Sequence, residues 1–220
     1  MLDMTENTDR PSFATLLEGA VATGEVVDRR SRFIAQLTAV QSERDAETFV
    51  ADVRARHHDA RHNVPAWVLS DGRERCSDDG EPQRTAGMPV LEVLRSEGLA
   101  DVCCVVTRYF GGTLLGPGGL VRAYTSATQE AVKAAREDGL VVRRTLVVPV
   151  VCVIPYSAYG RAERLVGECA GKVSDSIFAE DVQLTCVFAA GDEDRFVSAM
   201  RELAAGEELC RVGEPRFGEL

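Results

Sequence analysis

The segment from residue 102 to residue 138 places a buried strand, a glycine-rich loop and a long helix in direct succession. Val102–Val106 is an apolar run that predicts a strand, and Thr107-Arg108-Tyr109-Phe110 follows it. The loop then holds five glycines: Gly111, Gly112, Gly116, Gly118 and Gly119. A helical pattern begins at Leu120 and runs to about Asp138, where Gly139 is a fitting terminator. This succession predicts a domain with layers of helix and sheet.

Two interpretations of the glycine loop stay open. Glycines leave backbone N–H groups accessible at the start of a helix, where anions bind, and Arg108 and Arg122 flank this loop. The same glycines are equally consistent with a tight turn and close packing. Leu120-Val121 stands where a P-loop needs Lys followed by Ser or Thr, and the dinucleotide pattern is not met. Arg108, Arg122 and the five glycines are therefore candidate anion- or nucleic-acid-binding residues.

Composition limits the protein class. The 220 residues suit one large or two small domains, and 45% hydrophobic content suffices for a core. The formal net charge of −10 argues against loose binding to nucleic acid but leaves room for a local basic patch. Seven cysteines without a C-x-x-C pair predict reduced, buried thiols. With no signal peptide and no apolar run of membrane-spanning length, we expect a cytoplasmic protein that does not contact a membrane.

The first part of the chain predicts alternating strands and helices after a flexible tail at residues 1–15. Gly24–Val27 and Arg32–Leu37 read as strands joined by a charged turn, and Ser42 can cap a helix that ends near His57. Trp67–Leu69 reads as a further strand, and Thr85 can cap a helix from Ala86 to about Glu97. Residues 16–142 are expected to form the N-terminal domain.

After Gly139 the pattern starts again. Strand and helix signals follow in the order β-α-β-β-α-β, which is that of a ferredoxin-like unit. The strands are expected at 146–154, 172–178, 182–189 and 209–212, and the helices at 157–169 and 192–205. Residues 143–220 are therefore expected to form a separate ferredoxin-like domain, and the whole chain to be a two-domain α+β protein.

Several short motifs carry a resemblance to a known family. They are Ser77-Asp78-Asp79-Gly80-Glu81-Pro82, Thr85-Ala86-Gly87 with Pro89, Arg108-Tyr109-Phe110-Gly111-Gly112, Leu115-Gly116, Gly118-Gly119-Leu120 and Arg122-Ala123-Tyr124. In this order and spacing they resemble the signature of the IMPACT family and of its bacterial YigZ-like branch. One departure is Gln83-Arg84, where members usually have a small residue and glycine, so the path of that loop cannot be carried over.

The resemblance implies a fold and a link to translation. The N-terminal domain would be an α/β sandwich similar to domain IV of elongation factor G, and the C-terminal domain would be similar to domain V of that factor. Eukaryotic members restrain a translation-regulating kinase by competing for its activator through a further N-terminal domain. Because this chain has only a short stretch before its first expected strand, that contact is not carried over, while a link to translation is.

The acidic loop of the motif supplies further candidate residues. Asp78, Asp79 and Glu81 could hold Mg²⁺ with a substrate phosphate, or could cap turns and the following helix, or could pair with Arg108 or Arg122. Capping is the favoured interpretation, because no full ligand set is visible. Together with Thr85 and His62 these carboxylates form a possible functional loop; His62 suits hydrogen bonding or proton transfer better than zinc binding. We expect no metal site and no cofactor other than, at most, Mg²⁺.

Three functions remain open at this point. The first is a binding protein that contacts RNA or the ribosome, or a protein partner in translation control, with its anion site at the glycine loop. The second is an enzyme that acts on a phosphorylated small molecule or nucleotide with Mg²⁺ at the acidic loop. The third is a protein-interaction module. A locally basic face would favour the first, and a deep pocket shared by the two loops would favour the second.

Overall fold

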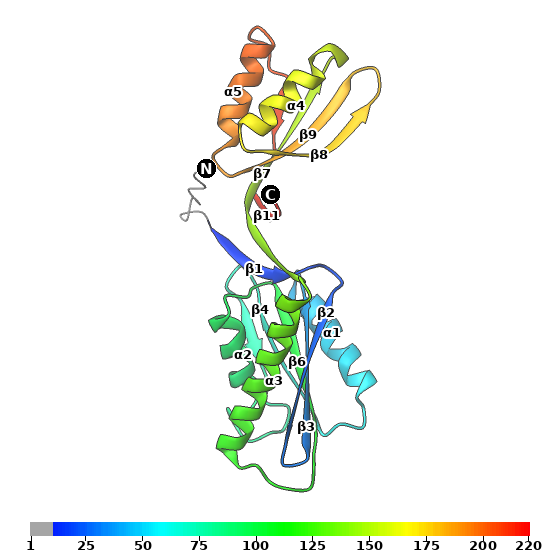
Figure 1. The fold of residues 1–220 in the computed structure, drawn as a ribbon, viewed down its shortest axis with the longest axis vertical. Coiled ribbons are helices and arrows are strands. Elements are labelled where there is room, and N and C mark those ends of the chain that lie inside the picture. The colour runs from blue at the N-terminus through cyan, green and yellow to red at the C-terminus, as the bar shows by residue number, and fades with distance from the viewer. Residues whose placement is uncertain (1–10) are drawn as a thin grey trace. The chain divides into compact units, whose positions relative to one another are not determined.

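The structure, a computed structural model, describes residues 11–220 and divides into two compact units (Figure 1). The N-terminal unit is Phe13–Arg143, and the C-terminal unit is Arg144–Leu220 together with residues 11 and 12. Strand β1 (Ser12–Leu16) occupies residues that the sequence assigns to a flexible tail, so the tail prediction is wrong from Ser12 onward. The rest of the predicted tail lies outside the described residues, apart from Pro11. The carbonyl of Pro11 accepts a hydrogen bond from the backbone N–H group of Leu146.

The N-terminal unit is built on a five-stranded antiparallel sheet in the order β2-β3-β6-β4-β5. The strands are β2 (Val21–Asp28), β3 (Ser31–Ala39), β4 (His62–Val68), β5 (Glu74–Cys76) and β6 (Val102–Tyr109). Central β6 is buried on both faces: Cys104 and Val106 belong to one core cluster, and Cys103 and Val105 belong to another. This explains why its sequence is an unbroken apolar run rather than an alternating one.

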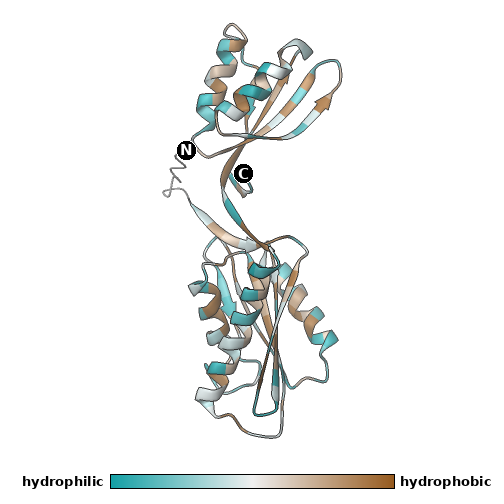
Figure 2. Cartoon of the chain, in the orientation of Figure 1, coloured by the Kyte–Doolittle hydropathy of each residue, from teal (hydrophilic) through white to brown (hydrophobic). Residues whose placement is uncertain are grey.

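Helices cover both faces of that sheet (Figures 1 and 2). The larger core cluster joins the sheet to α2 (Gly87–Ser96) and α3 (Pro117–Glu137), and the smaller one lies under α1 (Glu43–Arg56). Figure 2 shows hydrophobic residues along β6 and its neighbours, whereas the helices carry residues of both kinds. One face is therefore covered by two helices and the other by a single helix, which leaves part of the second face accessible.

Helix α3 starts earlier than its sequence pattern suggests. It begins at Pro117 rather than Leu120, because Gly116, with φ +73°, ends the loop and proline is suited to the first helical position. Helix α2 also differs. It begins at Gly87, and the hydroxyl of Thr85 donates to the carbonyl of Pro82 instead of capping the helix.

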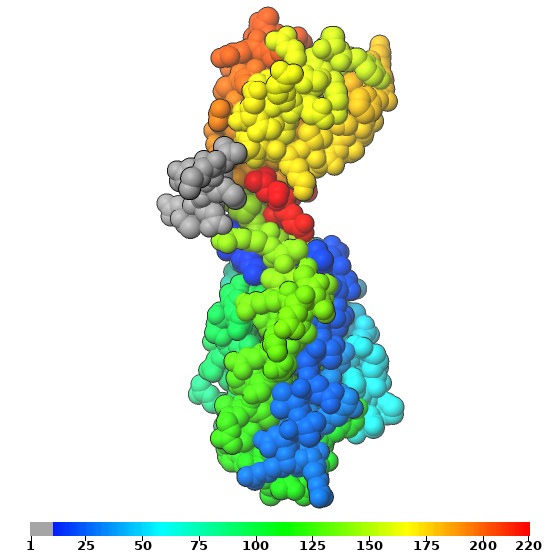
Figure 3. Space-filling model, viewed as in Figure 1, coloured from blue at the N-terminus to red at the C-terminus, as the bar shows by residue number. Residues whose placement is uncertain are grey.

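Helix α3 packs closely on β2, and the two surfaces lie directly against each other in Figure 3. A Cβ atom at Gly24 would lie 2.1 Å from the backbone nitrogen of Ala131.

We expect Gly24→Ala to lower the free energy of unfolding by about 1–3 kcal/mol, since helix and strand must separate to admit the methyl group. Urea unfolding measures this. Gly118→Ala, which meets open space in the same helix, should cost nothing, and equal losses in both variants would contradict the packing argument.

The C-terminal unit has the ferredoxin-like order that the sequence predicts. Its sheet runs β10-β7-β9-β8, all pairs antiparallel, with α4 and α5 packed on it. The elements are β7 (Val141–Ile154), the short 3₁₀ helix η1 (Tyr156–Ala158), α4 (Tyr159–Glu168), β8 (Lys172–Phe178), β9 (Val182–Ala189), α5 (Glu193–Leu203), β10 (Cys210–Val212) and β11 (Arg216–Gly218). Strand β11, which also pairs with β7, is not predicted from the sequence.

The cysteines depart from the expectation of free thiols. Cys152 of β7 and Cys210 of β10 form a disulfide, and the two residues stand directly opposite each other in the register of the strands. Their separation of 58 residues gives no local sequence signal for this pairing. Five other cysteines are free, as expected. No helix within residues 11–220 is long and apolar enough to span a membrane.

Candidate functional site

Asp78 of the acidic loop caps helix α2. Its carboxylate accepts hydrogen bonds from the backbone N–H groups of Arg84, Ala86 and Gly87 at 2.7, 3.1 and 2.9 Å. The N–H groups of Ala86 and Gly87 would otherwise lack partners at the start of the helix, and a carboxylate there also interacts favourably with the helix dipole. The capping role that the sequence assigns to Thr85 therefore belongs to Asp78.

Asp79 joins the acidic loop to α1 and β4. One carboxylate oxygen accepts from Arg54 at 2.6 Å and the other accepts from the backbone of Asn63 at 2.7 Å. Its carbonyl oxygen accepts from Nδ1 of His62 at 2.7 Å, which places the proton of a neutral His62 on Nδ1. His62 is thus a hydrogen-bonding residue that fixes the path of this loop.

Glu81 forms a buried polar cluster with Arg108 and Tyr124. Its Oε1 atom accepts from Nη1 of Arg108 at 2.6 Å and from the Tyr124 hydroxyl at 2.8 Å. Arg108 is 5% exposed and Glu81 is 9% exposed, and the guanidinium group lies over the rings of Phe33 and Phe110. Burial and the neighbouring Glu81 carboxylate both raise the pKa of Tyr124, so the hydroxyl stays protonated and donates. The acidic loop and the end of β6 are thereby tied together.

Of the roles that the sequence leaves open for the acidic loop, pairing with Arg108 agrees with the contact of Glu81. Arg108 is buried and its guanidinium is paired with this carboxylate, so it is not an exposed anion ligand. The three carboxylates of the acidic loop point to three different sets of donors. Within residues 11–220 no group of three His, Cys, Asp or Glu side chains is placed to hold a metal ion.

The glycine loop packs on the turn between β2 and β3. A Cβ atom at Gly111 would lie 2.1 Å from the carbonyl carbon of Arg30, and the N–H group of Gly111 donates to the hydroxyl of Ser31 at 3.2 Å. Gly112 has φ +85°, which a β-branched residue adopts only with strain. At least these two glycines are therefore needed for the conformation of the loop, whereas Gly118 meets open space.

The β2–β3 turn consists of two arginines in a strained conformation. Arg29 and Arg30 have φ values of +44° and +68°, in the left-handed region where such two-residue hairpin turns prefer Asn-Gly. Nη1 of Arg29 donates to the carbonyl of Leu114 in the glycine loop at 3.2 Å. Non-glycine residues in this conformation cost on the order of 1–3 kcal/mol each, and such strain is concentrated at functional positions.

The turn and the glycine loop together form an exposed surface that we call the tip. Arg61 lies over the ring of Phe110, which is 40% exposed, and Leu114 is 81% exposed. Arg122 is exposed in the first turns of α3. The tip comprises Arg29, Arg30, Arg61, Phe110 and Gly111–Gly116, and Arg122 follows it six residues after Gly116. Sequence analysis missed Arg29, Arg30 and Arg61, although the charged turn at residues 28–30 is visible in the sequence.

A chain of polar side chains also lies under the end of α1. Gln36 bonds to Nε2 of His57 at 3.1 Å, Nδ1 of His57 bonds to the Tyr109 hydroxyl at 2.9 Å, and that hydroxyl donates to Asp59 at 3.2 Å. A neutral His57 fits this chain, because Nε2 can accept from the Gln36 amide while Nδ1–H donates to Tyr109. Burial lowers the pKa of His57, and the Arg56 charge lowers it further.

This chain predicts an acid-sensitive contribution to stability. Since the folded-state pKa of His57 lies below the unfolded value of about 6.5, the unfolded chain takes up the proton more readily. The contribution is present above that value and is lost as the pH falls through it toward the folded pKa. Urea unfolding at a series of pH values should show a smaller loss of stability in His57→Gln than in the parent. An identical pH dependence in both proteins would contradict this assignment.

Comparison with known proteins agrees with this architecture. The Impact N-terminal domain model matches residues 29–132, and a domain of unknown function, DUF1949, matches residues 152–207. The chain is 35% identical to the IMPACT family member YvyE of Bacillus subtilis, covering 89% of both chains. It is also 35% identical to the IMPACT family member YigZ of Escherichia coli, covering 84% of this chain and 92% of the relative.

A solved structure described as that of a hypothetical protein shares the fold. It matches with 31% identity and a TM-score of 0.59, over 94% of this chain and 98% of that chain. Both family models fall within the two units of the structure, and the bacterial relatives span nearly the whole chain. The protein therefore belongs to the IMPACT family, in its bacterial YigZ-like branch.

Proposed function

We propose that this protein binds RNA through the tip of its N-terminal unit and acts on translation by contacting ribosomal RNA in the cytoplasm. The observation that carries the proposal is the β2–β3 turn, where Arg29 and Arg30 occupy left-handed positions beside the glycine loop. The chain tolerates this strain at a surface turn where Asn-Gly would be relaxed. We attribute the strained arginines to a requirement for two positive charges at this turn.

The chemistry of the tip suits nucleic acid. Arg29, Arg30 and Arg61 supply donors for phosphate. The Phe110 ring is 40% exposed beside the guanidinium groups of Arg61 and Arg108, and a base would stack on the exposed part of this ring. The chain as a whole carries a net charge of −10, so binding must be confined to such a local basic surface. Backbone N–H groups of the glycine loop would add further donors. The family's link to translation, and the expected likeness to domains IV and V of elongation factor G, direct the proposal toward the ribosome.

Two other functions have weaker support. An enzyme with Mg²⁺ at the acidic loop needs carboxylates that converge, and Asp78, Asp79 and Glu81 each contact different groups. A pure protein-interaction module would be favoured by an exposed apolar patch without basic residues, whereas the apolar groups of the tip lie among arginines. If the protein does not bind RNA, these two functions become the better explanations.

The proposal is tested with a fluorescently labelled single-stranded RNA. Fluorescence anisotropy gives the dissociation constant over a series of salt concentrations. If three arginines neutralise phosphates, the logarithm of the association constant should fall with the logarithm of salt with a slope of about −2. Absence of binding, or binding that salt does not weaken, would refute the RNA assignment.

Phe110 should contribute through stacking. Phe110→Ala is expected to weaken RNA binding by about 1–3 kcal/mol, since one base loses its aromatic partner, while the salt slope stays the same. Leu114→Ala is the matched control, because Leu114 is the more exposed apolar residue of the same loop and offers no ring. Equal affinity of the Phe110→Ala variant and the parent would remove stacking from the proposed binding mode. Circular dichroism checks that both variants are folded.

A further inference from the structure

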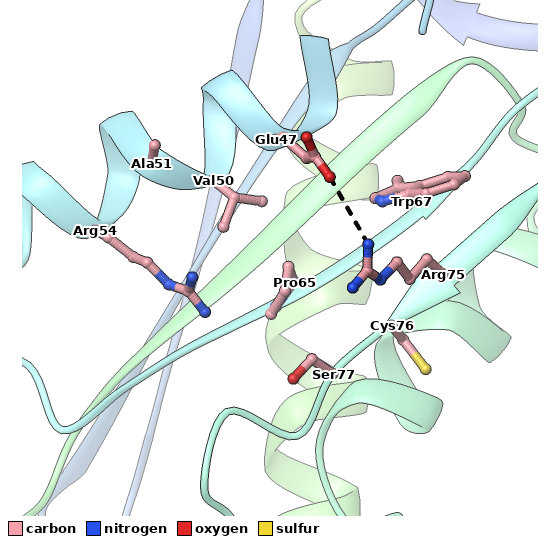
Figure 4. A pocket seen from close by; sticks show the side chains of 9 residues that line it. All are labelled: Glu47, Val50, Ala51, Arg54, Pro65, Trp67, Arg75, Cys76 and Ser77. Atoms are coloured by element: carbon pink, nitrogen blue, oxygen red, sulfur yellow. Dashed lines mark ion pairs between the residues drawn. The ribbon is translucent and has the colours of Figure 1, made fainter. Parts of the chain in front are cut away.

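A groove separates helix α1 from strands β4 and β5, on the face of the sheet that α1 alone covers. Its volume is about 590 Å³, within the range of sites for small molecules. None of its lining residues belongs to the tip, and only Ser77 belongs to the family motifs. The groove is lined by Glu47, Val50, Ala51, Arg54, Pro65, Trp67, Arg75, Cys76 and Ser77 (Figure 4).

The floor of the groove is apolar and rigid. Pro65 and Trp67 lie on β4, and Val50 approaches from α1. Trp67 and Val50 belong to the core cluster beneath α1, so their side chains are held in place by packing. Trp67 is only 6% exposed, so a flat ring would lie mainly on Pro65 and would touch the small exposed part of Trp67, beside the Arg75–Glu47 ion pair.

The rim of the groove presents two guanidinium groups. Figure 4 shows Arg54 from α1 and Arg75 from β5 directed from opposite sides toward the space at Pro65. Arg54 donates one hydrogen bond to Asp79, which holds the side chain and leaves its other N–H groups available.

The contact of Arg75 with Glu47 is weak. The two side chains are 68% and 66% exposed and their charged atoms are 3.7 Å apart, and such surface pairs contribute little to stability. An anionic ligand can therefore replace the Glu47 carboxylate as the partner of Arg75. Two convergent guanidinium groups match the several oxygens of a phosphate better than the two of a carboxylate.

We propose that this groove binds a nucleoside monophosphate, with the phosphate between Arg54 and Arg75 and the base on Pro65 and Trp67. The inference goes beyond RNA binding at the tip, because the residues of the two sites do not overlap. It concerns binding only, and no group in the groove is assigned a catalytic role.

Trp67 is the single tryptophan of the chain, so its fluorescence reports directly on the groove. The full-length protein is titrated with AMP. Because the nucleotide itself absorbs ultraviolet light and can lower the fluorescence without binding, calorimetry of the same titration checks that the signal comes from binding. We expect a saturable change with AMP, a weaker one with inorganic phosphate or adenosine alone, and a loss of affinity of about tenfold or more in Arg75→Gln. Arg73→Gln, which removes a neighbouring charge outside the groove, should bind AMP as the parent does.

Several results would overturn the proposal. One is the absence of a saturable signal in both methods, and another is unchanged affinity in a folded Arg75→Gln variant. Equal affinity for AMP and inorganic phosphate would show an anion site without recognition of the base. The Arg29→Asn, Arg30→Gly variant should bind AMP normally, so failure of one site is distinguishable from failure of the other.

Discussion

Replacing Glu81 with alanine is expected to lower the free energy of unfolding of the N-terminal unit by about 3–5 kcal/mol. The substitution leaves the buried guanidinium of Arg108 without its carboxylate partner, and the Tyr124 hydroxyl without its acceptor. Breaking a buried ion pair costs far more than the pair itself contributes, because the remaining charge stays buried without compensation. Urea unfolding, followed by far-ultraviolet circular dichroism, measures the loss.

Two comparison variants separate this effect from a general loss of charge. Glu25→Ala removes an exposed partner of Arg32 and should cost about 1 kcal/mol or less. Tyr124→Phe keeps the ion pair and removes one hydrogen bond, so its cost should lie between those of the two alanine variants. If Glu81→Ala is as mild as Glu25→Ala, then the buried cluster does not organise this part of the structure.

The double substitution Arg29→Asn, Arg30→Gly should have two opposite effects. It should raise the free energy of unfolding by about 1–2 kcal/mol, because Asn-Gly accepts the left-handed turn that the arginines occupy under strain. It should also weaken RNA binding by about 1.5–3 kcal/mol for each phosphate that an arginine no longer binds. Denaturant unfolding and RNA titration on the same preparation measure both.

The opposite signs make this variant informative. A variant that binds poorly because it is misfolded would lose stability together with affinity. Arg161→Ala combined with Arg164→Ala removes the same number of charges from α4 of the C-terminal unit and should leave RNA affinity unchanged if the tip is the binding surface. A stabilised Arg29→Asn, Arg30→Gly variant with undiminished RNA binding would show that the strained turn serves another purpose.

Periodicity predicts the elements that are governed by local rules. The bounds of β8 and β9 agree with the sequence prediction to the residue, and the apolar run at β6 marks the strand buried on both faces. Start and end points depend on single contacts that a pattern does not contain. Helix α3 begins at a proline that hydropathy does not mark. Capping by the acidic loop is the favoured interpretation of the sequence, but the pattern does not show that Asp78, nine residues before Gly87, caps α2 in place of Thr85.

The candidate site shows more clearly which features the sequence alone does not predict. The motifs point to the correct segments, and Glu81 of the acidic loop does meet Arg108 of β6. Which side chains face inward depends on the register of β6 with β3 and β4, and a sequence does not show that register. Sequence patterns therefore leave open whether Arg108 binds an anion or pairs with the acidic loop, and they give no sign that Arg29 and Arg30 lie beside the distant glycine loop. The Cys152–Cys210 disulfide depends on strand pairing in the same way.

Co-sedimentation with ribosomes tests the central claim most directly. The parent protein and the Arg29→Asn, Arg30→Gly variant are each centrifuged with purified ribosomes over a series of salt concentrations. We predict that the parent sediments with ribosomes at low salt and is released as salt rises, and that the variant stays in the supernatant at every concentration. Equal sedimentation of the two proteins, or no sedimentation of the parent at low salt, would contradict the assignment of the tip as a ribosome-binding surface.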